Sequence, residues 1–231
     1  YLLKIICLLV ILTIIMNDTG DLRNFRKSYE KGLISDNFKK FNPFFIFENW
    51  FEEAKQDKSI FEPNAMNLST VSLDQSPKSR IVLLKKFNSN GFTFFTNYES
   101  NKGKSISNNS SVCLNFYWPS LEKQIIIKGN ANKIPEKESE DYFNSRPFGS
   151  KIGAIVSKQS EVVENREFLE IKFREANNLY NKIKPKRPKD WGGYLVKPVL
   201  FEFWQGRKNR LHDRLEFIYE GDIWNSNRLS P

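Results

Sequence analysis

The sequence contains very little of what builds disulfide frameworks and metal centres. Its 231 residues include two cysteines, Cys7 and Cys113, and a single histidine, His212. Two cysteines are too few for a disulfide-rich fold. Because no cluster of cysteine and histidine is present, we expect no metal site, whether zinc or haem. The one histidine therefore has to be interpreted through its neighbours in the chain.

The familiar nucleotide-binding motifs are also missing. There is no G-x-G-x-x-G, and the segment Gly103-Lys104-Ser105 only looks like the end of a P-loop, since Tyr98 stands where that motif requires glycine. The segment lies between a predicted strand and a predicted helix. Free backbone N–H groups there, with Lys102 or Lys104, are able to hold a phosphate. A solvated helix start is the alternative interpretation.

Charge of one sign dominates the chain. The formal net charge is +9, with 27% charged and 39% apolar residues, which is typical of a globular protein. A positive excess favours anionic partners, such as nucleic acid, an acidic membrane or a phosphorylated small molecule. A lysine-rich solvated surface explains the same numbers. Charge alone therefore does not choose a partner.

The N-terminus divides into two segments before the main domain. Residues 1–15 are almost wholly apolar apart from Lys4 and Thr13, yet they are few for a membrane span and no small-residue cleavage site follows. We interpret them as an extension upstream of a start at Met16, with a membrane anchor as the alternative. Residues 16–40 predict a flexible basic arm, and residues 41–231 a single domain. We expect a cytoplasmic protein.

The hydrophobic pattern predicts a mainly β fold with inserted helices. Asn42-Pro43 predicts the start of a helix that ends near Lys58. Short strands joined by tight turns favour a sandwich or barrel, and 20 Phe and 5 Trp suit such a core. Strands are predicted at 65–73, 80–87, 92–96, 112–118, 124–134, 194–196, 200–204 and 216–219, with the last ending near Trp224, and further helices at 135–145, 152–157 and 164–180.

Two segments are candidates for chemistry. The run from Phe203 to Arg214 gathers aromatic and polar side chains on a strand and turn that is able to line a pocket. A basic surface turn is the alternative. Arg80 opens an apolar strand, and such an arginine more often faces an anion than remains buried and unpaired. The residues alone thus indicate a basic β protein with several positions suited to anions.

An ordered set of short motifs resembles the pyridoxamine 5′-phosphate oxidase family. The resemblance extends from about Arg26 to Pro231. The motifs are Arg80-Ile81-Val82-Leu83-Leu84-Lys85, Phe95-Thr96-Asn97, Leu121-Glu122-Lys123-Gln124, Ser145-Arg146-Pro147, Ser157-Lys158-Gln159-Ser160, Trp191-Gly192-Gly193, Phe203-Trp204-Gln205-Gly206, Arg210-Leu211-His212-Asp213-Arg214 and Arg228-Leu229-Ser230-Pro231. Each motif is weak by itself, and their order makes the set specific.

The resemblance implies an FMN-binding split β-barrel with FMN at a homodimer interface. It implies oxidation of pyridoxamine or pyridoxine 5′-phosphate to pyridoxal 5′-phosphate, with oxygen reoxidising the flavin to give hydrogen peroxide. The flavin carries the chemistry, and the protein supplies orientation and electrostatics. Neither nucleic acid nor membrane is then an expected partner. The alternatives are a split-barrel FMN oxidoreductase with another substrate and, from a different class, a nucleic-acid-binding β-barrel.

The resemblance also implies roles for individual residues. Arg210 and His212 would face the substrate ring as catalytic residues, positioning it and stabilising charge during hydride transfer. The implied FMN site consists of Arg80, Ile81, Val82, Leu83, Leu84, Lys85, Phe95, Thr96, Lys102, Gln124, Gln159, Ser160, Trp204 and Arg214. The implied substrate site consists of Lys85, Tyr142, Arg146, Ser150, Arg210 and His212, with Arg26 and Tyr29 from an N-terminal segment that closes over the substrate.

Three positions depart from the family pattern. Asn101 stands where an arginine usually precedes the phosphate-binding lysine, Ile155 where tryptophan is common, and Phe148 where arginine is frequent. Loss of one charge-assisted contact at Asn101 is worth about 1.5–3 kcal/mol. Lys104 is the expected compensation. These departures bear on FMN affinity more than on the Arg210 and His212 pair.

Overall fold

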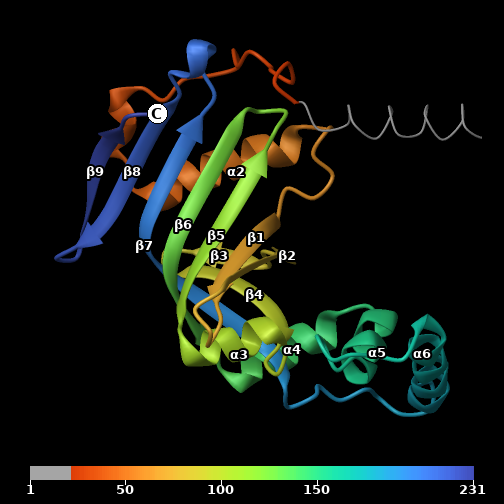
Figure 1. Ribbon diagram of the computed structural model, residues 1–231. Helices are drawn as coiled ribbons and strands as arrows, with labels where there is room; N and C mark the ends of the chain where they lie inside the picture. The colour runs from red at the N-terminus through yellow and green to blue at the C-terminus, as the bar shows by residue number, and fades with distance from the viewer. Residues whose placement is uncertain (1–21) are drawn as a thin grey trace, which may run out of the picture.

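The computed structural model describes residues 22–231 (Figure 1). The predictions for residues 1–15, and for the first part of the 16–40 arm, lie outside the described residues. Within 22–231, no helix is long and apolar enough to cross a membrane. The cytoplasmic location and the domain boundaries expected from the sequence stay predictions.

A curled antiparallel sheet dominates the described part of the chain. Its strands run in the order β2-β1-β5-β6-β7-β4-β3, and β8 and β9 continue from β7. The mainly β, split-barrel fold expected from the sequence is thereby confirmed. The strands are β1 (Ala65–Val71), β2 (Pro77–Leu83), β3 (Lys86–Asn88), β4 (Gly91–Asn97), β5 (Ser111–Trp118), β6 (Lys123–Lys133), β7 (Trp191–Gln205), β8 (Asp213–Glu220) and β9 (Ile223–Leu229).

Strand β7 is the longest strand and connects the parts of the sheet, because it pairs with β6, β4 and β8. One of its edges pairs with β6 throughout, whereas the other pairs first with β4 and then with β8. Two separate strands, 194–196 and 200–204, were predicted here, and this was wrong. Pro198 lacks the N–H that a ladder needs, but the β6–β7 register shifts there, since Gly129 pairs with Pro198 and Lys128 with Leu200, and the strand continues past the unpaired Val199.

The predicted strand at 80–87 is two strands in the structure. Strand β2 pairs with β1, and β3 pairs with β4. Between them, the Leu84 N–H donates to Asn64 O at 2.8 Å and the Lys85 N–H to Thr93 O at 2.9 Å. The chain therefore changes partners at these two residues, a tertiary choice that a continuous apolar run does not reveal. Strand β9 was not predicted at all.

The core lies between the sheet and helix α2 (Pro43–Gln56). Asn42 caps this helix by accepting from the Phe44 N–H at 2.9 Å, as its sequence predicted. The fully buried Phe47 packs against Phe92 and Phe116, with ring centroids 4.8 and 5.3 Å away. The apolar face of α2 therefore belongs to the core.

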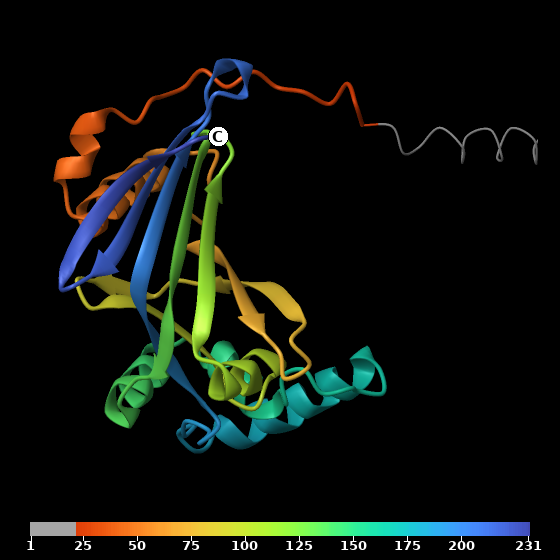
Figure 2. The same ribbon diagram turned by 60° about the vertical axis from the view of Figure 1, so that its left-hand side comes forward.

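The remaining helices occupy the end of the sheet where β4 meets the beginning of β7 (Figure 1). They are α3 (Asn101–Asn108), α4 (Glu136–Ser145), α5 (Phe148–Val156) and α6 (Arg166–Tyr180), and short 3-10 turns span η1 (Asp36–Lys40) and η2 (Lys208–Arg210). At the opposite end, the N-terminal segment passes the η2 turn (Figure 2). The two ends of the sheet therefore carry different groups of predicted site residues.

Candidate active site

A cavity of about 1020 Å³, which we call the cationic pocket, opens at the helical end of the sheet. Strands β2 and β4 and helices α3, α4 and α5 contribute its lining. Five lining residues are basic and none is acidic: Lys78, Arg80, Lys85, Lys102 and Arg146. Because five cationic side chains line the pocket and no carboxylate does, the charge of the pocket is suited to binding anions.

Lys102 is the most buried of these cations, and Arg80 lies close enough to affect its pKa. The Arg80 guanidinium donates from Nη1 to Leu68 O at 3.1 Å and to Thr70 Oγ1 at 2.8 Å, two neutral acceptors. Lys102 lies in the first turn of α3 and is only 7% exposed. Burial, followed by the charge of Arg80, lowers the pKa of Lys102 to about 8. Two cations held so close lack the counter-ion that an anionic ligand supplies.

Polar side chains from distant segments converge on Lys102. Its Nζ donates to Gln159 Oε1 at 2.8 Å, and the Thr96 hydroxyl donates to the same oxygen at 3.0 Å. The Asn101 N–H donates to Ser160 Oγ at 3.3 Å, and Ser160 has a positive φ of 77°. Strand β4, the start of α3 and the loop after α5 thus meet at one point, which brings together Thr96, Lys102, Gln159 and Ser160 of the predicted FMN site.

A stack of aromatic rings forms another wall of the pocket. Phe95 stacks on Tyr142 with ring centroids 3.8 Å apart and on Trp191 at 5.6 Å. The Arg146 guanidinium lies 4.7 Å from the centre of the Trp191 ring. Its Nη1 is buried without a hydrogen-bond partner, and burial lowers the pKa of Arg146. A buried, unsatisfied guanidinium nitrogen beside a cavity is a further vacant donor for an anion.

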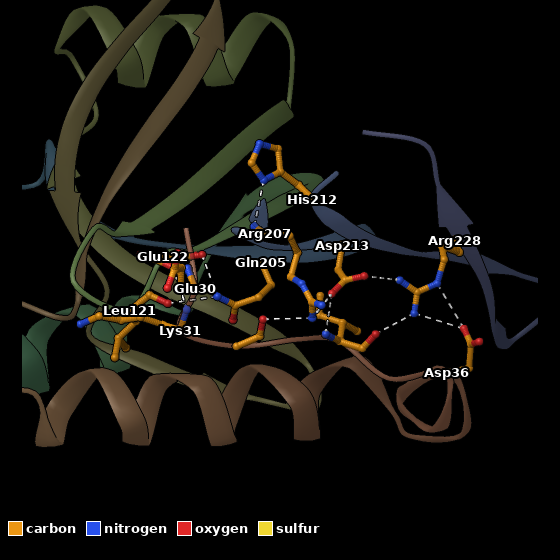
Figure 3. Close-up of polar contacts among 12 residues, drawn as sticks. Glu30, Lys31, Asp36, Leu121, Glu122, Gln205, Arg207, His212, Asp213 and Arg228 are labelled. Atoms are coloured by element: carbon orange, nitrogen blue, oxygen red, sulfur yellow. Dashed lines mark hydrogen bonds and ion pairs between the residues drawn. The ribbon is translucent and has the colours of Figure 1, made fainter. Parts of the chain in front are cut away.

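A second group, the aromatic cluster of Tyr29, Trp204 and His212, lies at the opposite end of β7. The His212 ring is 4.7 Å from Trp204 and 5.5 Å from Tyr29. Its Nδ1 accepts from the Arg207 N–H at 3.1 Å (Figure 3). Burial, followed by the charge of Arg210, lowers the pKa of His212. The ring is therefore neutral near pH 7, with its proton on Nε2.

The residues around the aromatic cluster come from paired strands. Gln124 of β6 and Arg214 of β8 both lie opposite Trp204 in the sheet register. Arg214 Nε donates to Glu202 Oε1 at 2.7 Å. Arg210 is exposed on the η2 turn with a φ of 60°. Gln124 and Arg214 thus flank Trp204, the ring that Tyr29 contacts edge-on.

One chain does not bring the two groups together. Thr96, in the cationic pocket, pairs with Gly192, and Trp204 lies twelve residues further along β7. At about 3.3 Å per residue, the two positions are up to roughly 40 Å apart along the strand. The predicted residues Arg80, Ile81, Val82, Leu83, Lys85, Phe95, Thr96, Lys102, Tyr142, Arg146, Ser150, Gln159 and Ser160 line the pocket, whereas Gln124, Trp204, Arg210, His212, Arg214 and Tyr29 do not.

Two predicted residues lie in neither group. Leu84 is 4% exposed and belongs to the hydrophobic core. Arg26 is exposed, and its Nε donates to Arg23 O at 2.9 Å. Their implied contacts with flavin and substrate stay predictions.

Lys78 is a pocket residue that the sequence reasoning missed. It lines the cationic pocket together with Asn101, and it precedes Arg80 by two positions on β2. Side chains two apart on a strand project to the same face, so this alternation was the available signal. Lys104, the expected compensation for Asn101, lines a separate cavity of about 370 Å³ with Tyr98. Lys78 is therefore the better placed substitute for the absent arginine.

Comparison with family models decides the relationship. The model described as pyridoxamine 5′-phosphate oxidase matches residues 52–180, more than half of the chain. The model described as the pyridoxine 5′-phosphate oxidase C-terminal dimerisation region matches residues 191–231. The chain belongs to the pyridoxamine 5′-phosphate oxidase family.

Individual relatives agree with that assignment. A pyridoxine/pyridoxamine 5′-phosphate oxidase from Christiangramia forsetii is 49% identical, covering 91% of this chain and 99% of the relative. The chloroplastic oxidase 1 of Arabidopsis thaliana is 46% identical over 91% of this chain and 41% of its own length. Among solved structures, PhzG from Burkholderia lata superposes with a TM-score of 0.80 at 26% identity, covering 86% of this chain and 98% of that one.

The family assignment gives the two groups of residues a common context. The dimerisation model covers β7, β8 and β9, which carry Trp204, His212 and Arg214. Trp204 and His212 of the aromatic cluster therefore lie in the segment that the dimerisation model matches, and the first model matches the pocket residues from β2 to the loop after α5.

Proposed function

We propose that the chain is an FMN-dependent oxidase that converts pyridoxamine or pyridoxine 5′-phosphate to pyridoxal 5′-phosphate with release of hydrogen peroxide. The observation that carries the proposal is the cationic pocket, with five basic and no acidic lining residues, in a chain whose relatives bear that activity in their names. Both the cofactor and the substrate of that reaction are phosphate esters, so the proposal requires two anion sites.

The first anion site suits the phosphate of FMN. Arg80 and Lys102 approach one another without an acidic partner in the pocket, and the α3 N-terminus with Ser160 adds polar groups. A phosphate dianion would offset the burial and the repulsion by Arg80 that lower the pKa of Lys102, and it would gain charge-assisted hydrogen bonds. Gln159 and Thr96, already bonded to each other, would orient the lysine. The pocket volume suits a ligand of this size.

The second anion site suits the phosphate of the substrate. Arg146 has a buried Nη1 without a partner, and Tyr142, Ser150 and Lys85 line the same cavity. The stack of Phe95 on Tyr142 offers flat apolar surface beside these donors. Since donors to phosphate and an aromatic wall occur together, a phosphorylated aromatic ring is the ligand class that fits.

We infer that the complete site forms between two copies of the chain. One copy would supply the cationic pocket, and the other would supply Gln124, Trp204, Arg210, His212 and Arg214 to the flavin and substrate ring. The distance along β7 prevents one copy from supplying both groups. The match of the dimerisation model to residues 191–231 supports this assembly.

The chain's own groups would bind, orient and exclude water. Bound FMN would supply the acceptor for hydride, a chemistry that protein side chains lack. His212 offers a neutral Nε2–H donor, and Arg210 offers a fixed positive charge next to it. Together they would hold the reacting carbon of the substrate and stabilise charge as two electrons and two protons leave it. Oxygen would accept these and leave as hydrogen peroxide, and water would release ammonia when the substrate is the amine.

A related oxidoreductase with another substrate is the second candidate. The Burkholderia lata structure is described in complex with tetrahydrophenazine-1-carboxylic acid. By its name, this ligand is a carboxylic acid and not a phosphate ester. Arg146 with a free Nη1 would accept a carboxylate as well as a phosphate. Turnover of dephosphorylated pyridoxamine as fast as that of the phosphate ester would favour this candidate.

The deciding experiment is an absorption spectrum of the purified protein with FMN. We expect a flavin spectrum that bleaches when pyridoxamine 5′-phosphate is added without oxygen, followed by one equivalent of peroxide when air is admitted. A protein that binds no FMN would refute the proposal. Salt-sensitive binding to generic DNA that needs no flavin would instead favour the alternative that the chain is a nucleic-acid-binding β-barrel.

A further inference from the structure

Residues 29–34, here called the strap, cross the end of the sheet without joining it as a strand. Side chains satisfy their backbone groups instead. The N–H groups of Glu30 and Lys31 donate to Glu122 Oε2 at 2.7 and 2.9 Å. The Ile34 N–H donates to Asp213 Oδ2 at 3.1 Å, and Arg228 Nη2 donates to Ile34 O at 2.7 Å (Figure 3). The position of the strap therefore depends on a few individual side chains.

Glu122 connects the strap to the strand that carries Trp204. Its side chain is 2% exposed and sits in the turn between β5 and β6, with a left-handed φ of 55°. Its carbonyl oxygen accepts from the Gly206 N–H at 2.8 Å and from Gln205 Nε2 at 3.1 Å. One residue thus binds the strap through its carboxylate and the end of β7 through its backbone (Figure 3).

The strap also carries Tyr29, whose ring is part of the aromatic cluster. Tyr29 immediately precedes Glu30 and packs edge-on against Trp204 at 5.7 Å and His212 at 5.5 Å. A Cβ on Gly206 would lie 2.7 Å from Tyr29 Cγ, so only glycine admits the ring there. The two hydrogen bonds from the strap to the Glu122 carboxylate, which we call the latch, therefore determine where Tyr29 lies.

We propose that Glu122 is a positioning residue for the oxidation, acting by latching the strap so that Tyr29 covers His212 and Trp204. This rests on the proposed function, because the benefit of an ordered Tyr29 is a closed substrate site. The residue touches neither ring of the cluster in the contacts described and acts through the backbone N–H groups of Glu30 and Lys31. Both of those residues are exposed, so water can satisfy their N–H groups once the latch is removed, and the fold can persist.

The first test needs no cofactor and no activity. Trypsin can cleave after Arg26 and Lys27, which precede the strap, and after Lys31 within it. In the full-length Glu122→Ala variant, we expect cleavage after Lys31 to be at least roughly tenfold faster than in the wild type, because local opening no longer breaks hydrogen bonds to a buried carboxylate. Cleavage after Lys182, an exposed residue that follows α6, serves as the internal reference, because Lys27 itself pairs with Glu122 at 3.9 Å and cleavage next to it would also change. The fragments are identified by mass spectrometry over time.

A conservative variant and a matched control separate the latch from general damage. Glu122→Gln keeps an oxygen that can accept both N–H groups, and it should restore most of the protection after Lys31. Glu170→Ala removes a carboxylate from an exposed pair with Arg166 on α6, and it should leave cleavage unchanged. If Glu122→Gln behaved like Glu122→Ala, the charge of Glu122 and not its hydrogen bonds to the strap would matter, and the latch would be refuted.

The second readout connects the latch to the reaction. For Glu122→Ala loaded with FMN, we expect the KM for pyridoxamine 5′-phosphate to rise roughly tenfold, with a smaller change in kcat and an unchanged FMN affinity. Unchanged cleavage after Lys31, or faster cleavage with an unchanged KM, would overturn the proposal. If the wild-type protein failed to oxidise the substrate, the proposed function would fall, and the proteolysis would still decide whether Glu122 latches the strap.

Discussion

Raising the pH above 8 should weaken the binding of FMN, because Lys102 loses its proton in the free protein. Burial and the charge of Arg80 lower the pKa of this lysine to about 8 from its usual 10.5. A phosphate monoester is a dianion above about pH 6. Both partners are therefore charged between about pH 6 and 8, and affinity should be highest there.

The size of the effect follows from the two pKa values of Lys102, free and bound. Above pH 8, each further unit should cost roughly tenfold in affinity, or about 1.4 kcal/mol. A charge-assisted hydrogen bond to phosphate is worth about 1.5–3 kcal/mol, which would raise the bound pKa by about one to two units. The loss should then level off between about pH 9 and 10, at a total of roughly 10- to 100-fold.

Quenching of flavin fluorescence by the apoprotein measures this dependence directly. Lys102→Arg keeps its charge across the range and should bind FMN with little change between about pH 7 and 10. Riboflavin, which lacks the phosphate, should show no such decline with the wild-type protein. A wild-type affinity that stays constant across this range, or a decline that persists in Lys102→Arg, would refute the assignment of Lys102 to the phosphate.

Further substitutions probe the other parts of the site. Lys78→Ala should weaken FMN binding roughly tenfold, whereas Lys104→Ala, in a separate cavity, should leave the Kd unchanged. Asn101→Arg should tighten FMN binding by about 1.5 kcal/mol or more, and an unchanged Kd would show that Lys78 already compensates. Arg146→Ala should raise the KM for the phosphorylated substrate roughly 100-fold, and an equal effect on dephosphorylated pyridoxamine would contradict its phosphate role. Arg210→Ala should lower kcat/KM at least roughly 100-fold with FMN still bound, and full turnover would remove it from the reaction.

The separation of the cationic pocket from the aromatic cluster has a consequence for mixed subunits. If the site forms between two copies, the Arg80 substitution of one copy and the Arg210 substitution of the other fall in the same site of a mixed dimer. One intact site should then remain in each heterodimer, and mixing two inactive variants under exchange conditions should recover activity. This complementation would distinguish a shared site from two independent ones.

Local sequence patterns predicted individual elements well where one partner determines them. Asn42-Pro43 marked the start of α2, because capping and a proline at the first helical position are local properties. The same patterns gave wrong strand boundaries where the chain changes its pairing partner or where the register of a strand pair shifts. The apolar run from Arg80 to Phe87 gives no sign that β2 and β3 pair with different neighbours, and the predicted gap between 196 and 200 is closed by a register shift at which Val199 of β7 has no partner on β6.

Motif order by itself determined the family of this protein, because the motifs are short segments whose residues are read directly from the sequence. It also predicted Arg80 and Lys102 as phosphate ligands and Arg210 with His212 as a catalytic pair, and these roles stay predictions. Only the tertiary structure decided which of these residues meet. The length of β7 places Trp204 far from Thr96, the alternation along β2 brings Lys78 to the face of Arg80, and the buried carboxylate of Glu122 holds Tyr29 against His212. Distances between segments depend on strand length, register and burial, and these are set by packing among distant parts of the chain.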